Sequence, residues 1–189
     1  MESPHQANAR ASRTRTRLID AALELFERNG YDQTTAAAIA AAAGVTEMTF
    51  FRHFSTKDQL LLDDPYDPLL ASAVLAQPPG PPLLRTISGI RSAWRTLPEP
   101  AGDFTKRRIR IVASTPGLRA AVARNNAGTE LVIADALIAD GTDSLQARVA
   151  VAAVIAAMSV ALMEWSQQEK ATLGETIDAA LGVLDAHHG

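Results

Sequence analysis

Residues 34–60 read TTAAAIAAAAGVTEMTFFRHFSTKDQL, and this stretch decides the fold of the N-terminal part of the chain. Thr35 is a suitable N-cap for a short alanine-rich helix that ends at Gly44, and Thr46 is a suitable N-cap for a second helix over 47–53. Two short helices cross closely only where small side chains separate them, and the turn needs a residue that accepts a positive φ. Gly44 and the alanines before it meet both needs. The stretch therefore predicts a helix-turn-helix.

Helical periodicity continues on both sides of this stretch. Upstream, apolar residues recur at helical spacing over 13–29, and Asn29-Gly30 supplies a stop. Downstream, a capping box of Thr56 with Gln59 predicts a helix over 57–62. Further helices are predicted at 67–77, 83–97, 103–114, 116–140, 143–170 and 175–187. Strand signals are absent. We therefore expect an all-α fold of about nine helices, with a three-helix N-terminal domain over 1–62, preceded by a basic arm, and a larger helical domain over 63–189.

Charge and composition narrow the class of protein. The net charge is −3, but Arg10, Arg13, Arg15 and Arg17 precede the first acidic residue of that segment, Asp20. This basic arm is either a solvated tail or a nucleic-acid contact. The absence of cysteine excludes disulfides, thiolate zinc sites and cysteine nucleophiles. No catalytic or phosphate-loop motif is present, so we predict no enzyme, cofactor or metal site. Apolar stretches are shorter than a membrane span and no signal core is visible, which favours a cytoplasmic protein without membrane contact.

The full string resembles the DNA-binding signature of the TetR family of bacterial regulators over roughly residues 13–62. Shared features are the paired threonines before the second helix, Gly-Val-Thr at the turn, Thr-Phe-aromatic-Arg-His-Phe in the recognition helix, and Ser-x-Lys after it. The resemblance implies a homodimeric, ligand-responsive transcriptional regulator. It would be a repressor that a small-molecule effector releases from a palindromic double-stranded operator. The alternative is a helical adaptor that retains the motif without binding DNA.

The resemblance also assigns DNA-binding roles to individual residues. Phosphate contacts would come from the basic arm, from the start of the second helix and from the end of the motif, and base contacts from the recognition helix. The residues so assigned are Arg13, Thr35, Thr46, Glu47, Met48, Thr49, Phe51, His53 and Lys57.

Several of these assignments leave two readings open. Glu47 either accepts from a cytosine amino group or only complements the helix dipole. Met48 either covers a thymine methyl group or packs on the surface. Phe51 stands where the family commonly has tyrosine, so a sugar contact replaces the phosphate bond or that contact is missing. Lys57 opposes the dipole of the predicted fourth helix, which a phosphate partner would explain.

The C-terminal segment predicts a dimer interface. The helix over 143–170 is apolar around most of its circumference, so a second face needs covering. Together with the last helix it resembles the pair that forms an intermolecular four-helix bundle in this family. The alternative is the fully buried central helix of a monomer. Predicted interface residues are Val151, Ile155, Met158, Leu162, Ile177, Leu181 and Leu184.

The effector is suggested only by residues 107–122. This stretch resembles a subgroup of TetR-type regulators, including mycofactocin-type regulators, whose C-terminal domain is described as acyl-CoA-like ligand binding. An acyl-CoA-like or other apolar ligand is therefore expected. The basic residues over 106–119 could meet its phosphates, or they could form an ordinary solvated face. Candidate pocket residues are Trp94, Phe104, Arg108 and Trp165, for which core packing is the alternative.

Overall fold

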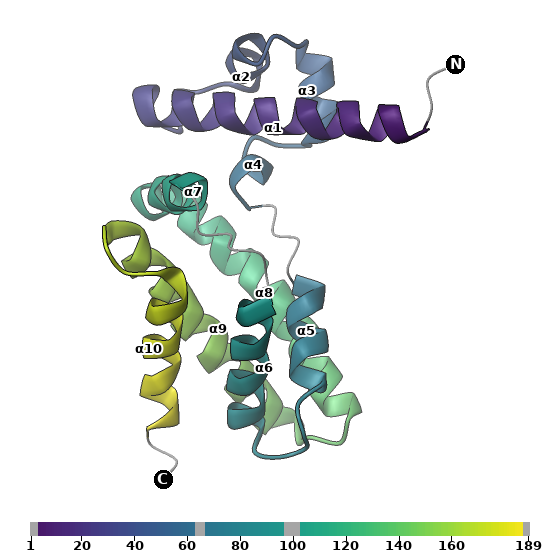
Figure 1. Cartoon of the computed structure of the whole chain (residues 1–189), viewed down its shortest axis with the longest axis vertical. Coiled ribbons are helices and arrows are strands. Elements are labelled where there is room, and N and C mark those ends of the chain that lie inside the picture. Colours follow the sequence, from purple (N-terminus) through teal and green to yellow (C-terminus); the bar gives the residue numbers. More distant parts are fainter. Residues whose placement is uncertain (1–3, 63–66, 97–102, 187–189) are drawn as a thin grey trace. The chain divides into compact units, whose positions relative to one another are not determined.

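The computed structural model describes residues 4–62, 67–96 and 103–186, and these residues form ten α-helices and no strand (Figure 1). The chain divides into two compact units, Met1–Asp63 and Asp64–Gly189. The helices are α1 Pro4–Asn29, α2 Ala36–Ala42, α3 Glu47–His53, α4 Gln59–Leu62, α5 Asp67–Leu75, α6 Pro82–Thr96, α7 Asp103–Ser114, α8 Pro116–Ala139, α9 Ser144–Gln167 and α10 Leu173–Asp185. The all-α prediction is confirmed, and each of the ten helices overlaps a range predicted from the sequence. The predicted ends at Leu97 and His187 lie outside the described residues.

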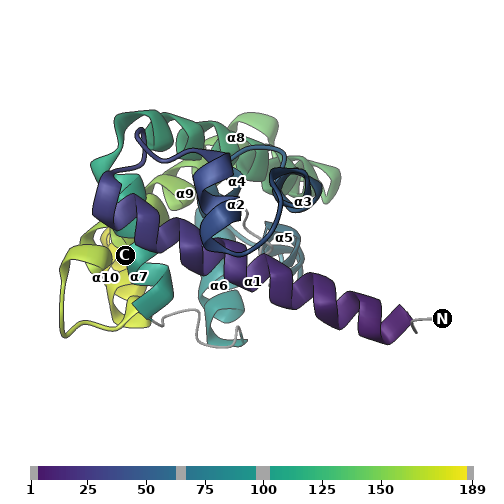
Figure 2. The same ribbon diagram turned by 90° about the horizontal axis from the view of Figure 1, so that it is seen from above.

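The first unit is built on the long helix α1. Within this unit, α2 and α3 lie on one side of α1 and α4 lies on the other (Figures 1 and 2). The core between them contains Leu18 and Phe26 of α1, Ile39 of α2 and Phe50 of α3, all buried. The apolar periodicity of α1 over its second half therefore faces the helix-turn-helix, as the sequence predicts.

Local capping fixes the ends of α2 and α3. The hydroxyl of Thr35 accepts from the backbone N of Ala38, and the hydroxyl of Thr46 accepts from the backbone N of Thr49. Gly44 has φ +65°, in the left-handed region that favours glycine. All three features agree with the predicted helix-turn-helix.

The start of α4 differs from the prediction. The helix begins at Gln59 rather than at Lys57. The side-chain oxygen of Gln59 accepts from the backbone N of Ser55 at 2.7 Å and from the Ser55 hydroxyl at 3.1 Å. The glutamine thus reaches back to Ser55 instead of forming the predicted capping box with Thr56.

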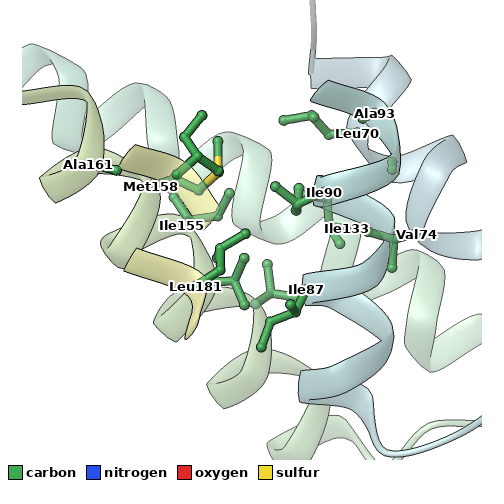
Figure 3. Packing of buried hydrophobic residues seen from close by; sticks show 14 of the residues in the cluster. Leu70, Val74, Ile87, Ile90, Ala93, Ile133, Ile155, Met158, Ala161 and Leu181 are labelled. Carbon is green, nitrogen blue, oxygen red and sulfur yellow. The ribbon is translucent and has the colours of Figure 1, made fainter. Parts of the chain in front are cut away.

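The second unit is organised around α9, which packs against α6, α7, α8 and α10. In Figure 3, Ile155 and Met158 of α9 and Leu181 of α10 point toward Ile87 and Ile90 of α6. By length and composition α9 is apolar enough to cross a membrane, and it is the one such helix among the described residues. Its inner face forms the hydrophobic core of this unit, so core packing accounts for the apolar residues on that face.

A partly buried ion pair fastens three helices of the second unit. The side chain of Arg85, on α6, is only 5% exposed. Its Nη1 donates to Oδ2 of Asp140 at 2.7 Å, and its Nη2 donates to the carbonyl of Leu75 at 3.2 Å. Asp140 is the C-cap of α8, and Leu75 is the last residue of α5. The guanidinium therefore joins the ends of α5 and α8 to the first turn of α6.

We expect Asp140→Ala to lower the free energy of unfolding by about 2 kcal/mol, because it leaves the buried Arg85 charge without its carboxylate. Half of the Asp140 side chain is exposed, which keeps the loss below that of a fully buried pair. Asp135→Ala is the matched control, since Asp135 pairs with Arg148 on the surface at 3.5 Å. That change should cost less than about 0.5 kcal/mol. Urea unfolding measures both variants, and equal losses would contradict the buried-pair interpretation.

Candidate nucleic-acid interface

Helix α3 buries one face and exposes the other. Phe50 is fully buried, and Phe54, which follows the helix, is nearly so. The two rings contact each other at 5.9 Å between centroids. On the opposite face, Met48 is 82% exposed and Phe51 is 50% exposed. Burial of two phenylalanines therefore fixes the rotation of a short helix whose free face carries two large apolar side chains.

The three threonines assigned to DNA contact all lie at or near the beginning of a helix. Thr35 is exposed at the N-terminus of α2, and Thr46 is exposed at the N-terminus of α3. The hydroxyls of Thr46 and Thr49 are hydrogen-bonded to each other at 3.0 Å. A helix N-terminus presents unpaired N–H groups and a positive dipole end, so both positions suit an anion such as a phosphate.

Charged side chains flank the apolar face of α3. Glu47 is exposed in the first turn, and Arg52 is exposed in the last. His53 is half-buried, and burial together with the charges of Arg52 and Arg15 holds its pKa below the ordinary value. His53 is therefore mostly neutral at pH 7, with a single ring N–H to donate. Sequence reasoning missed Arg52, although a cation three positions after Thr49 on the recognition helix is a visible signal.

The basic segment near the N-terminus is helical, which corrects the expected arm. Helix α1 begins at Pro4, a residue preorganised for the first helical position, and continues through the arginines. Arg17 donates to the carbonyl of Ala43, the C-cap of α2. The guanidinium of Arg15 lies 4.3 Å from the centre of the Phe54 ring. Arg13 is exposed. Two of these arginines thus hold the helix-turn-helix, and Arg13 remains on the surface.

Lys57 is half-buried and contacts the loop between α1 and α2. Its Nζ donates to the carbonyls of Tyr31 at 2.8 Å and Thr34 at 3.2 Å, and lies 4.0 Å from the centre of the Tyr31 ring. Because α4 begins only at Gln59, the predicted conflict between Lys57 and a helix dipole does not arise. These intramolecular partners explain the position of Lys57 without a phosphate.

The residues predicted for an effector pocket lie in different environments of the second unit. Trp165 is buried in the core, and its indole N–H donates to the carbonyl of Ala171 at 3.1 Å. Trp94 is half-buried and packs against the same hydrophobic cluster. Phe104 is partly exposed, and Arg108 is half-buried. The structure therefore joins the two tryptophans through the core, and ordinary packing accounts for Trp165.

Three cations of the basic stretch at 106–119 bind the ends of helices. Lys106 donates to the carbonyl of Gln168 at 2.8 Å, and Arg110 donates to the carbonyl of Ser166 at 2.6 Å, both at the C-terminus of α9. Arg119 donates to the carbonyl of Ala113, near the end of α7, at 2.7 Å. Cations stabilise helix C-termini through the dipole and through unpaired carbonyls. Structural capping thus explains these charges without ligand phosphates.

The residues predicted for the dimer interface lie on the inner side of α9 and α10. The seven residues lie in or against the core of a single chain: Val151, Ile155, Met158, Ile177 and Leu181 are buried, and Leu162 and Leu184 are half-buried against the same cluster. The exposed apolar residues of the same two helices are Leu145, Val149, Val160 and Val183. Helix α9 is apolar on both sides, so periodicity alone did not distinguish its inner from its outer face.

Comparison with known proteins places both units in one family. Residues 18–63 match the family described as bacterial regulatory proteins, tetR family, and residues 83–189 match the MftR C-terminal domain. The chain is similar to the HTH-type transcriptional regulator TcmR of Streptomyces glaucescens, with 34% identity over 81% of this chain and 73% of that protein. A candidate mycofactocin biosynthesis regulator of Mycobacterium tuberculosis, MftR, is 30% identical over 97% of this chain and 96% of its own length.

A solved structure agrees in fold. NalD of Pseudomonas aeruginosa, a secondary repressor of the MexAB-OprM multidrug efflux pump, superposes with a TM-score of 0.61. The match covers 93% of this chain and 96% of that one at 24% identity, which supports the fold alone. The sequence relatives and the two domain matches carry the assignment further. The chain therefore belongs to the tetR family of bacterial transcriptional regulators and carries a C-terminal domain of the MftR type.

Proposed function

We propose that this protein is a cytoplasmic, non-enzymatic repressor that binds a palindromic operator as a homodimer, with α3 of each subunit in the major groove. The observation that carries the proposal is the orientation of α3, in which Phe50 is fully buried while Met48 and Phe51 face outward. A helix held by buried aromatic rings, with large side chains on its free face, is suited to contact with base edges.

Different residues of the first unit contact the bases, the phosphates and the sugars of the DNA. Met48 covers a thymine methyl group, the apolar feature that distinguishes thymine in the major groove. Glu47 accepts from a cytosine amino group. The hydroxyl of Thr49 is hydrogen-bonded to that of Thr46. Thr35, Arg13 and His53 contact phosphates, which position the helix without selecting a sequence. Phe51, which has no hydroxyl, packs against deoxyribose.

The dimer forms through the outer faces of α9 and α10. Leu145, Val149 and Val160 of α9 recur at helical spacing and are more than half exposed, as is Val183 of α10. Because α9 and α10 pack against each other within one chain, we assign their exposed apolar residues to one interface. A second copy covers it in an isologous four-helix arrangement. The two copies of α3 then read half-sites about one helical turn, roughly 34 Å, apart.

Release from DNA follows when a small molecule binds the second unit. The MftR-type domain match supports a ligand-binding role for this unit. An acyl-CoA-like or other apolar ligand suits a helical unit whose core is built from aliphatic side chains and two tryptophans. The ligand binds more tightly to a conformation of the dimer in which the two recognition helices have a different separation. Binding shifts the population toward that conformation and so lowers operator affinity.

Selection of bound duplexes from a random pool tests the proposal. We expect the wild-type protein to enrich a palindrome with a thymine in each half-site. Met48 should contact the methyl group of that thymine. Exchange of that thymine for deoxyuracil, which removes only the methyl group, should weaken wild-type binding about three- to tenfold and should leave Met48→Ala unaffected. Acyl-CoA added to the complex should release the DNA. Failure to enrich any sequence would contradict operator binding.

A further inference from the structure

The loop before α2 is held by a cluster from the other end of the helix-turn-helix. Besides the two carbonyl contacts of Lys57, the Tyr31 hydroxyl donates to a carboxylate oxygen of Asp58, the residue next to Lys57. Burial and this hydrogen bond raise the pKa of Tyr31 well above its ordinary value, so the phenol remains a donor at neutral pH. Lys57 therefore contacts the backbone carbonyl and the ring of Tyr31, and Asp58 accepts from its hydroxyl.

One of the two carbonyls belongs to the peptide bond that joins Thr34 to Thr35. Thr34 is itself buried, and its hydroxyl donates to the carbonyl of Gly30 at 2.8 Å. The Thr34 carbonyl accepts from the Lys57 ammonium at 3.2 Å, so Thr34 is held both through its side chain and through the peptide group that leads to Thr35. Thr35 follows directly, and its hydroxyl caps α2.

We infer that Lys57 is a positioning residue for the phosphate contact of Thr35, and not itself a phosphate ligand. The inference rests on the proposed function, because it assumes that Thr35 meets DNA. Two of the three ammonium protons of Lys57 are already used on carbonyls, and its charge lies against an aromatic ring. Removal of Lys57 therefore loosens the loop and weakens binding indirectly.

The dependence of operator affinity on salt concentration separates positioning from direct contact. Each phosphate that a side chain neutralises makes the negative slope of log K against log salt about 0.9 steeper, so a contact made by both subunits contributes about 1.8. We expect Lys57→Met to weaken operator binding about tenfold without changing this slope. Arg13→Met is the matched control, because Arg13 is an exposed cation of the same unit that we assign to a phosphate. Its slope should become shallower by about 1.8, because the dimer loses one phosphate contact in each subunit.

A double-mutant cycle supplies a second readout. Thr35→Val should weaken binding in the wild-type background and add almost nothing in the Lys57→Met background, since the hydroxyl is already misplaced. Tyr31→Phe, which keeps both carbonyls and the ring, should give a smaller loss with the same slope. This variant also keeps the test decisive if Lys57→Met unfolds the first unit.

Two results would overturn the inference. One is a slope that becomes shallower by about 1.8 in Lys57→Met, which would make Lys57 a phosphate ligand in both subunits. The other is additive losses for Lys57→Met and Thr35→Val, which would mean that the two residues act independently. Either result leaves the proposed function standing, because the wild-type protein still binds its operator. A wild-type protein that binds no operator would instead remove the proposed function, and the positioning role with it.

Discussion

Replacing Val149 with glutamate is expected to convert the dimer into folded monomers and to weaken operator binding by at least about 100-fold. Val149 is 60% exposed on the outer face of α9, so the carboxylate stays hydrated in a monomer and does not disturb the core. In an isologous dimer the same residue enters the interface twice, which brings two like charges into one apolar contact. We expect the free-energy cost of burying these two carboxylates to exceed the gain from burying the apolar side chains of two helices per subunit.

Loss of the dimer should lower the affinity for the operator, because the two half-site contacts depend on each other. A linked second recognition helix binds at a high effective concentration, and a monomer loses that advantage. Sedimentation equilibrium measures the mass, which should fall from twice 20.1 kDa to 20.1 kDa. Leu69→Glu is the control, because Leu69 is an equally exposed apolar residue on α5, away from α9 and α10 in sequence. A dimeric Val149→Glu protein would refute the proposed interface.

Helix ends were predictable where they depend on residues three or four positions apart. Thr35 and Thr46 cap α2 and α3, and Gly44 takes the positive φ of the turn between them. Predicted bounds for α7 also agree with the structure. The start of α4 was missed because Ser55 and Thr56 are both good caps, and only the three-dimensional reach of the Gln59 side chain selects Ser55.

Longer-range partners could not be predicted from local pattern. The contact of Lys57 with Tyr31 spans 26 residues, so the sequence shows a cation without showing what it binds. The same limit applies to Arg17, which reaches the end of α2 from a segment that was expected to be an arm. In each case a charged side chain that suggested DNA or ligand phosphate has a backbone carbonyl of the chain itself as its partner.

The sequence pattern could not show which face of α9 packs into the core, and the reason is different. Val149 and Val151 are two positions apart, so a helix of 3.6 residues per turn places them about 200° apart, on nearly opposite sides. Both are valine, and both sides of the helix are apolar along its length. Only the packing of α6, α8 and α10 around α9 shows that Val151 is internal and Val149 external. A charged residue at position 149 should therefore dissociate the dimer, whereas a charged residue at position 151 should destabilise the fold.

Val151→Asp is expected to unfold the second unit rather than to dissociate the dimer. Val151 is fully buried among apolar side chains, and a carboxyl group there has no partner to compensate its lost hydration. We expect a loss of at least about 4 kcal/mol in the free energy of unfolding, a large part of the stability of a domain. Circular dichroism should show reduced helix content, and proteases should cleave the second unit rapidly.

The pH dependence of this variant identifies its cause. Burial raises the pKa of a carboxyl group, so the folded state of Val151→Asp binds a proton that the unfolded state releases above about pH 4. The unfolding free energy should therefore rise as the pH falls from 7 to 5, relative to the wild-type protein. Val151→Ala, which only leaves a small cavity, should lose about 2 kcal/mol with no such recovery. A folded, monomeric Val151→Asp protein at pH 7 would instead place Val151 in the dimer interface and return α9 to the orientation that the sequence pattern first favoured.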